Sequence, residues 1–201
     1  MQIVEEGLAS FETALGVCAV RWTKAGIASV RLPSSRTAIL PTLGADVAAP
    51  GSVRAAIEAI VAVLAGSGDD LRFVELDERG IEPWRREVYA ATRRIAPGTL
   101  ATYGEIGRTI GRTGPETARE VGVALARNPF PIVVPCHRVL GANGKLTGFS
   151  APGGLETKRR MLELEGAPGF GQQVLFGQTP VFESAVRPVR GSREADSARR
   201  T

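Results

Sequence analysis

The sequence contains very few residues of the kinds that bind metal ions or form disulfide bonds. Among 201 residues there are two cysteines, Cys18 and Cys136, and a single histidine, His137. A structural zinc site is usually held by four cysteine or histidine ligands, so we expect no metal site. Two cysteines cannot form the disulfide framework of a small secreted protein, which favours a reducing compartment. We expect no metal and no cofactor.

Long apolar runs are also missing. No stretch of about 18 uninterrupted apolar residues is present, and residues 1–6 show neither the basic flank nor the apolar segment of a signal peptide. The mean hydropathy is +0.01 and 43% of the residues are hydrophobic, which is enough for a buried core in one or two domains. We therefore expect a soluble, cytoplasmic, monomeric protein with no membrane partner.

Lysine is scarce, and the basic charge is unevenly distributed. Lys24, Lys145 and Lys158 are the only lysines, so arginine supplies most of the positive charge. Seven basic and ten acidic residues give residues 1–80 a net charge of −3, whereas 18 basic and 11 acidic residues give residues 81–201 a net charge of +7. A basic half favours a polyanionic partner such as nucleic acid, although arginine-rich surfaces also occur on proteins that bind none.

The first part of the chain predicts a small antiparallel sheet with a helix. Apolar residues alternate over 11–32 on both sides of a turn, which predicts a hairpin in which Cys18 serves only for packing. Apolar residues recur at helical spacing over 53–64, and 71–76 is a further strand candidate for the same sheet. No residue of this part suggests chemistry.

The following part predicts several helices. Apolar spacing indicates a helix from Pro83 to Ile95, and Thr102 with Glu105 has the pattern of a capping box that opens a short helix. The segment Thr113–Glu116 repeats the capping pattern before a second helix, Glu116 to Arg127. Two short helices in a basic region form either a helix-turn-helix or an ordinary helical hairpin.

The last part predicts a turn and a final helix. Gly141–Gly144 has the composition of a tight turn, whose flanks would form a hairpin. A helix is expected over 155–165, with Gly166 directly after it, and residues 169–201 are expected to be a largely disordered extension. The fold class is therefore α+β, with a small antiparallel sheet and helix followed by a mainly helical, winged-helix-like part that carries the helix-turn-helix.

The main candidate for chemistry is Cys136, directly before His137 at the end of an apolar run that predicts a buried strand. Only the thiolate is a strong nucleophile, and an ordinary cysteine is only slightly ionised at neutral pH, so a base must remove its proton. Adjacent side chains of a strand point to opposite faces, so contact between the two residues needs a turn after Pro135 or a bridging water. For an isolated Cys-His pair, an inert buried thiol is the commoner case.

The surrounding residues change that expectation. The run Asn128–Val139, with its Pro-Cys-His-Arg-Val core, and the segment 141–150 closely resemble the active-site signature of the O6-alkylguanine-DNA alkyltransferases, or methylated-DNA–protein-cysteine methyltransferases. The resemblance extends from about Pro83 to Gly166 and, more weakly, over the first eighty residues. It implies a ribonuclease H-like domain over 1–80 and a DNA-binding catalytic domain over 81–168.

This resemblance also implies the reaction. A methyl or small alkyl group would move irreversibly from O6-alkylguanine, or from O4-alkylthymine, in double-stranded DNA to Cys136, once per molecule and without a cofactor. His137 would deprotonate Cys136 through a bound water, and Glu165 would orient the imidazole. Asn128 would brace the turn that carries the cysteine, and Tyr103 would lie beside the guanine and its phosphate.

On the substrate side, the resemblance implies that Arg119 enters the duplex and fills the gap left by a flipped base. Ser150 would reach O6, and the backbone carbonyl of Val139 would bind the guanine amino group. Gly148 and Phe149 would line the pocket, and Phe149 stands where many members of the family have tyrosine.

Three other functions remain open. An alkyltransferase-like protein would bind lesions without transfer, but such proteins replace the cysteine that is retained here. An unrelated Cys-His hydrolase would turn over through an acyl-enzyme. A transcription regulator with a redox-active cysteine would bind one DNA sequence and respond to peroxide.

Overall fold

The computed structural model of the protein describes residues 5–42, 48–67 and 70–171. Most of the predicted C-terminal extension, 169–201, lies outside the described residues, so its disorder stays a prediction. Within the described ranges, no helix is both long enough and apolar enough to cross a membrane.

Three antiparallel strands form a sheet in the order β1-β2-β3. They are β1 (Gly7–Phe11), β2 (Cys18–Thr23) and β3 (Gly26–Arg31). The predicted hairpin is confirmed as β2 and β3, whose register pairs Thr23 with Gly26 at the turn. Cys18 is completely buried at the start of β2, as its packing role requires.

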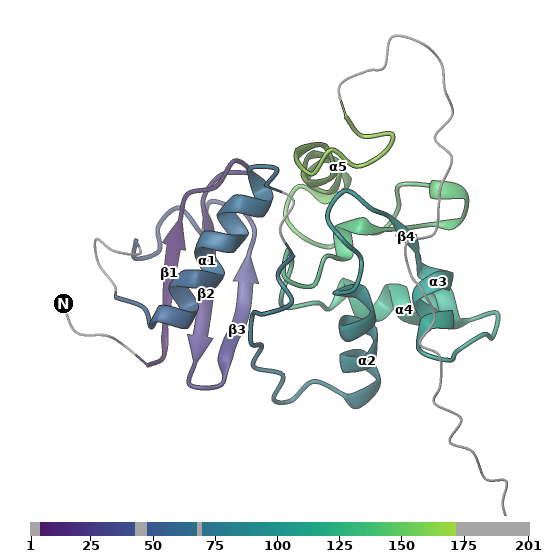
Figure 1. Cartoon of the computed structure of the whole chain (residues 1–201), viewed down its shortest axis with the longest axis horizontal. Helices are drawn as coiled ribbons and strands as arrows, with labels where there is room; N and C mark the ends of the chain where they lie inside the picture. Colours follow the sequence, from purple (N-terminus) through teal and green to yellow (C-terminus); the bar gives the residue numbers. More distant parts are fainter. Residues whose placement is uncertain (1–4, 43–47, 68–69, 172–201) are drawn as a thin grey trace, which may run out of the picture.

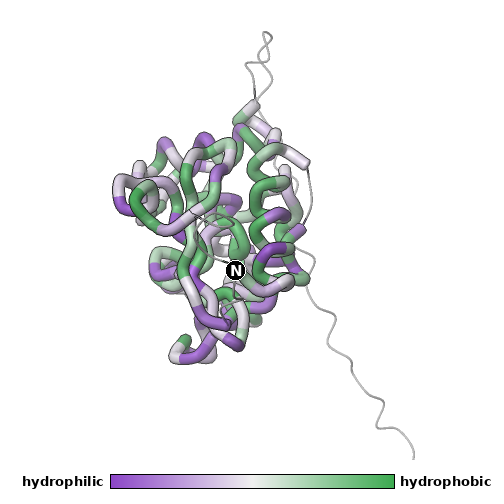
Figure 2. The backbone as a smooth tube through the Cα atoms, turned by 90° about the vertical axis from the view of Figure 1, so that its left-hand side faces the viewer, coloured by the Kyte–Doolittle hydropathy of each residue, from purple (hydrophilic) through white to green (hydrophobic). Residues whose placement is uncertain are grey.

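The helix α1 (Gly51–Leu64) lies beside this sheet (Figure 1) and confirms the helix predicted over 53–64. Its buried residues recur every three or four positions, so one face of the helix is apolar and the other faces water. These are Val53, Ala56, Ile57, Ile60, Val63 and Leu64. Figure 2 shows the same interleaving of hydrophobic and hydrophilic residues along the chain, as expected for segments with one buried face.

The strand predicted over 71–76 is wrong. Within it only Leu76 pairs with the sheet, through a single parallel bridge to Ile27. The guanidinium of Arg93 donates hydrogen bonds to the carbonyl oxygens of Leu71, Arg72 and Val74 at 2.8–2.9 Å. Carbonyl groups bound in this way are held in a turn around one side chain, so they do not form a strand ladder.

The helices α2 (Pro83–Thr92) and α3 (Tyr103–Thr109) follow. α2 begins at Pro83 as predicted but ends three residues before Ile95. The capping box at the start of α3 is confirmed, because the Thr102 hydroxyl accepts from the Glu105 N–H at 3.2 Å and the Glu105 carboxylate accepts from the Thr102 N–H at 2.7 Å. α3 therefore begins at a position that the sequence fixes locally.

The helix α4 (Thr117–Ala126) lies against α3 (Figure 1). The second capping box, expected at Thr113–Glu116, does not form, because the helix begins three residues later, with Glu116 as its N-cap residue and no capping bond from that side chain. The Thr117 N–H instead donates to the Gly114 carbonyl at 3.1 Å. A Cβ atom at Gly107 would collide with the methyl group of Thr117, so the close packing of α3 on α4 requires glycine there.

Two short strands, β4 (Ala101–Thr102) and β5 (Val139–Leu140), pair in parallel. The hairpin predicted around Gly141–Gly144 is therefore wrong: β5 pairs with β4, and the residues after it form the short 3-10 turn η2 (Ala142–Gly144). The carbonyls of Thr147 and Gly148, which a hairpin would need, accept hydrogen bonds from side chains instead.

The final helix, α5 (Gly154–Leu164), matches the predicted range within one residue at each end. Glu165 follows as its C-terminal cap, and Gly166 has the left-handed φ of 64° that ends many helices. α5 therefore ends directly at a residue to which the family resemblance assigns a role in the site.

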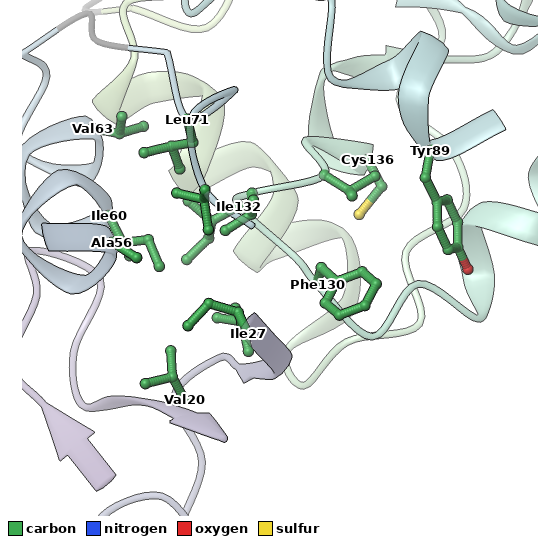
Figure 3. Close-up of a cluster of buried hydrophobic side chains, with 14 of the residues drawn as sticks. Val20, Ile27, Ala56, Ile60, Val63, Leu71, Tyr89, Phe130, Ile132 and Cys136 are labelled. Atoms are coloured by element: carbon green, nitrogen blue, oxygen red, sulfur yellow. The ribbon is translucent and has the colours of Figure 1, made fainter. Parts of the chain in front are cut away.

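One buried apolar cluster includes residues of the sheet, α1, α2, α4 and the segment that carries Cys136. Figure 3 shows Ile132 and Phe130 of that segment among the side chains of this cluster. At the edge of the sheet, the Val30 N–H donates to the Pro129 carbonyl at 2.9 Å. The sheet thus packs directly against the cysteine-bearing segment, and the predicted division of the chain near residue 80 stays a prediction.

Candidate active site

Cys136 begins a single 3-10 turn, η1 (Cys136–Arg138). The predicted strand before it is wrong, because residues 131–134 form a turn and Ile132 has a φ of 75°. A β-branched residue in this region is strained, and such strain persists only where neighbouring contacts impose it. The turn expected after Pro135 is present, with the Arg138 N–H donating to the Pro135 carbonyl at 2.9 Å.

The contacts that hold this turn come largely from Asn128. Its Nδ2 donates to the Val134 carbonyl and its Oδ1 accepts from the Phe130 N–H, both at 2.9 Å. The two bonds span the strained Ile132 and fix the backbone that leads to Cys136. Contacts of this kind are what the implied bracing role of Asn128 requires, and the role itself stays a prediction.

His137 and Glu165 meet although they lie 28 residues apart. His137 Nε2 lies 2.9 Å from Glu165 Oε1, and both side chains are buried. Arg138 binds the same carboxylate through two bonds, Nε to Oε2 at 2.8 Å and Nη2 to Oε1 at 2.7 Å, and its Nη1 donates to the Ile95 carbonyl at 2.6 Å. The end of α5 is thereby attached to η1 by a buried, hydrogen-bonded ion pair.

These contacts determine the protonation states. Burial tends to raise the pKa of Glu165, but the hydrogen bonds and charges of His137 and Arg138 outweigh it and lower that pKa to about 2. Because arginine stays charged at all relevant pH values, the two bonds from Arg138 favour the ionised form of Glu165 whatever the protonation state of His137. Burial also lowers the pKa of His137, against the opposing charge of Glu165, so the imidazole is neutral near pH 7.

An ionised carboxylate only accepts hydrogen bonds, so the neutral imidazole must carry its proton on Nε2. Nδ1 is then an unprotonated base. It is buried and makes no hydrogen bond to any described residue. The site therefore offers one free proton acceptor next to Cys136.

The thiol of Cys136 lies in a buried environment, with 9% of the residue exposed. Burial raises its pKa, while the hydrogen bond from Asn128 and the positive charge of Lys158 act in the opposite direction. Deprotonation consequently depends on groups that the fold brings to the thiol.

Cys136 opens into a cavity of about 890 Å³. Of the residues predicted to bind substrate, five line it together with Asn128: Tyr103, Arg119, Gly148, Phe149 and Ser150. Val139 does not line it, because the residue is completely buried and its carbonyl accepts a hydrogen bond from Lys158 Nζ at 2.6 Å. The structure thus gathers most of the expected substrate residues around one hollow.

The cavity wall is held by hydrogen bonds. The Tyr103 hydroxyl lies 3.3 Å from the Thr147 carbonyl and 3.4 Å from the Gly148 carbonyl, and the Ser150 hydroxyl donates to the Ala126 carbonyl of α4 at 2.7 Å. Gly148 has a φ of 55°, and a Cβ atom there would lie 2.9 Å from the Tyr103 hydroxyl. Only glycine fits this position without strain.

Arg119 lies at the rim of the cavity on α4. Its side chain is 83% exposed and lies 3.6 Å from Glu116 in a surface ion pair. Such an exposed pair contributes little to stability, so the guanidinium can leave it at small cost.

Sequence reasoning missed several residues of the site. Arg138 and Lys158 were given no role, and the N-terminal part was expected to contribute no chemistry, yet Arg31 and Arg36 line the cavity. A signal for Lys158 was present in the sequence: it precedes Met161, Leu162 and Glu165 by three, four and seven positions, which places a lysine on the buried face of a helix. Among the described residues, no three His, Cys, Asp or Glu side chains are grouped so that they could hold a metal ion.

Comparison with known proteins gives a consistent result. Residues 83–167 match the family profile described as 6-O-methylguanine DNA methyltransferase, DNA binding domain. A methylated-DNA–protein-cysteine methyltransferase of Mycobacterium tuberculosis is 42% identical over 127 residues, which cover 63% of this chain and 73% of that protein. A methylated-DNA–protein-cysteine methyltransferase of Methanosarcina acetivorans is 48% identical over 94 residues, which cover 47% of this chain and 57% of that protein.

Solved structures agree with the sequence relatives. The fold is similar to the crystal structure of Mycobacterium tuberculosis OGT in complex with DNA, with a TM-score of 0.64 and 36% identity over 81% of this chain and 96% of that one. It is also similar to the O6-methylguanine-DNA methyltransferase of Pyrococcus kodakaraensis strain KOD1, with a TM-score of 0.61 and 27% identity over 80% of this chain and all of that one. The chain belongs to the methylated-DNA–protein-cysteine methyltransferase family.

Proposed function

We propose that this protein repairs DNA by moving a methyl or small alkyl group from O6-alkylguanine, and from O4-alkylthymine, to Cys136. The transfer is irreversible and occurs once per molecule, with the protein acting as a monomer on double-stranded DNA. The observation that carries this proposal is the buried array of His137, Glu165 and Arg138 next to a cysteine that opens into a cavity. Membership of the methyltransferase family supports it.

The residues account for each proton and bond. His137 Nδ1 takes the proton of Cys136 through a bridging water, and Glu165 stabilises the imidazolium that forms. The thiolate attacks the alkyl carbon, a C–S bond forms, and the bond from that carbon to O6 breaks. The departing guanine takes the electron pair and then the proton, so neither an oxidant nor a cofactor is needed.

Cys136 can reach the lesion only if the nucleotide leaves the base stack. We infer that α3 and α4 form a helix-turn-helix in a winged-helix-like unit, with α4 against the duplex. Arg119 is exposed at the rim of the cavity, so its planar cation can enter the duplex and replace the stacking of the flipped base. A related OGT from Mycobacterium tuberculosis has been solved in complex with DNA.

Within the cavity, Tyr103 and Ser150 lie where they can contact the base. Both hydroxyls donate to backbone carbonyls in this structure, and O6 of an alkylated guanine can only accept, so a hydroxyl that contacts O6 must turn its proton from its carbonyl partner to the base. Ser150 is the proposed contact to O6. A backbone carbonyl near Cys136 is the proposed acceptor for the guanine amino group; the Val139 carbonyl, the other candidate, accepts from Lys158 Nζ, and Val139 does not line the cavity.

The decisive experiment is mass spectrometry of the protein after incubation with a duplex oligonucleotide that contains O6-methylguanine. We expect one methyl group on Cys136 in the wild-type protein and in Cys18→Ala, and none in Cys136→Ala. His137→Ala should react at least about a hundredfold more slowly, which is the range of general-base effects. An unmodified wild-type protein contradicts the proposal, and a protein that turns over repeatedly supports a hydrolase instead.

A further inference from the structure

Lys158 is a buried cation that the proposed reaction does not use. It lies on α5 and is completely shielded from solvent. Its Nζ donates to the carbonyls of Val139 at 2.6 Å, Thr147 at 2.8 Å and Gly148 at 3.2 Å. All three ammonium protons are therefore used on backbone oxygens, and no carboxylate of the described residues pairs with this charge in a salt bridge.

The three carbonyls belong to two parts of the site. Val139 begins β5, directly after the turn that carries Cys136 and His137. Thr147 and Gly148 line the cavity, and their carbonyls are the ones that lie within reach of the Tyr103 hydroxyl. Lys158 thus connects the cysteine-bearing turn to the opposite wall of the cavity.

A buried ammonium with three carbonyl partners is costly to lose. Charge-assisted hydrogen bonds are stronger than neutral ones, and removal of the cation would leave three backbone oxygens without this partner. Gly148 has a left-handed backbone and Thr147 lies in no helix or strand, so this part of the wall is held mainly by the side chains that bind its carbonyls, Lys158 at the shorter distances and Tyr103 at 3.3–3.4 Å. The positions of the wall and of Cys136 consequently depend on the same side chain.

We propose that Lys158 is a positioning residue for the alkylated base, because its ammonium holds the cavity wall at Thr147–Gly148 against β5 at the distance that lets the base face Cys136. This inference rests on the proposed function. It assigns to Lys158 an effect on base binding that exceeds the influence of its charge on the pKa of Cys136.

The titratable groups around Lys158 allow a test by pH. They are Cys136 and His137 on η1 and Tyr103 on α3, whose ring centre lies 5.8 Å from Nζ. Burial lowers the pKa of Lys158 to about 8, against the raising influence of Cys136. Burial raises the pKa of Tyr103, so the hydroxyl stays protonated while the ammonium loses its charge. The cavity wall should therefore loosen as the pH rises above about 8.

The first test uses two reagents on Cys136. O6-Benzylguanine must occupy the cavity, whereas iodoacetamide is small and reports mainly the thiolate fraction. For Lys158→Met we expect the concentration of O6-benzylguanine that gives the half-maximal rate to rise by about tenfold or more. The iodoacetamide rate should fall by a smaller factor, because loss of the positive charge also raises the pKa of Cys136. Lys145→Met is the matched control, because Lys145 is exposed and lines no part of the cavity.

Equal losses with both reagents would overturn the inference, since the charge would then act on the thiol alone. No loss with either reagent would also overturn it.

The second test needs no variant. The half-saturating concentration of O6-benzylguanine for the wild-type protein should rise several-fold between about pH 7 and pH 9, and a flat profile would contradict the role of the ammonium. A wild-type protein that O6-methylguanine DNA leaves unmodified refutes the proposed function, whereas an active wild type matched by Lys158→Met refutes only the inference.

Discussion

Glu165 Oε1 lies 2.9 Å from His137 Nε2, and the contact joins the end of α5 to the turn that carries the nucleophile. It fixes which nitrogen of the imidazole holds the proton, because the carboxylate can only accept. The opposite nitrogen is thereby left as a base. The proposed chemistry therefore depends on a residue that follows a helix 28 positions further along the chain.

Glu165→Gln should slow methyl transfer by about a hundredfold or more, since a neutral amide no longer stabilises the imidazolium and can hold either tautomer. The single-turnover rate on an O6-methylguanine duplex measures the effect. Glu163→Gln, two residues earlier on the same helix and outside the array, should keep the wild-type rate within about twofold. A normal rate in Glu165→Gln would show that His137 needs no partner.

Stability should fall in acid. The pKa of Glu165 is about 2 in the folded protein and about 4.3 in an unfolded chain, so the unfolded state binds more protons between these values. The stabilisation is complete above about pH 4.3 and is lost as the pH falls toward 2, by about 3 kcal/mol in total. His137, whose pKa is lowered, adds a loss in the same direction below about pH 6.5.

Urea unfolding from neutral pH down to about pH 3 measures this dependence. In His137→Asn, the loss of unfolding free energy that begins near pH 6.5 should disappear, whereas the loss of unfolding free energy below about pH 4.3 should remain. A stability that is independent of pH over the whole range would contradict the buried pairing.

Arg119→Ala should weaken repair of duplex DNA by about tenfold or more and change the reaction with free O6-benzylguanine little, because only the duplex requires an extruded base. Its side chain is 83% exposed, so the free energy of unfolding should change by less than about 0.5 kcal/mol. The single-turnover rates of Arg119→Ala and of the wild-type protein, measured with both substrates, test this expectation. Equal losses on both would remove Arg119 from base flipping.

Gly148→Ala should impair O6-benzylguanine binding, because its Cβ atom would press on the Tyr103 hydroxyl. Gly111→Ala is a matched control, since Gly111 also has a positive φ, 77°, but open space around the position of a Cβ atom. Both changes should cost about 1–2 kcal/mol of unfolding free energy from backbone strain, as urea titration can show. Only Gly148→Ala should also raise the half-saturating concentration of O6-benzylguanine. The same half-saturating concentration in both variants would contradict the predicted contact between the added Cβ atom and Tyr103.

Features with local causes were predictable from the sequence. The β2–β3 hairpin, the apolar face of α1, the capping box of Thr102 and the glycine that follows α5 each depend on residues within a few positions of one another. The pairing of Cys136 with His137 and Glu165 was accessible only through the family resemblance, because no spacing rule brings residues 137 and 165 together.

Features that depend on the contacts of one particular polar side chain were not predictable. The apolar run before Cys136 has the composition of a strand, but the bonds from Asn128 bend it into a turn. Arg93 organises residues 71–74 from a later part of the chain, and Lys158 binds the carbonyls that a hairpin after β5 would have used. In each case one polar side chain overrides the local preference of the backbone.

The bond from Val30 to Pro129, together with the apolar cluster that spans both halves of the chain, has a practical consequence. A fragment that begins near residue 81 would lose the partner of the Pro129 carbonyl and expose the apolar side of the segment around Ile132 to water. Such a truncated protein should be recovered mostly as insoluble material, so a shortened form of this protein should retain the N-terminal sheet.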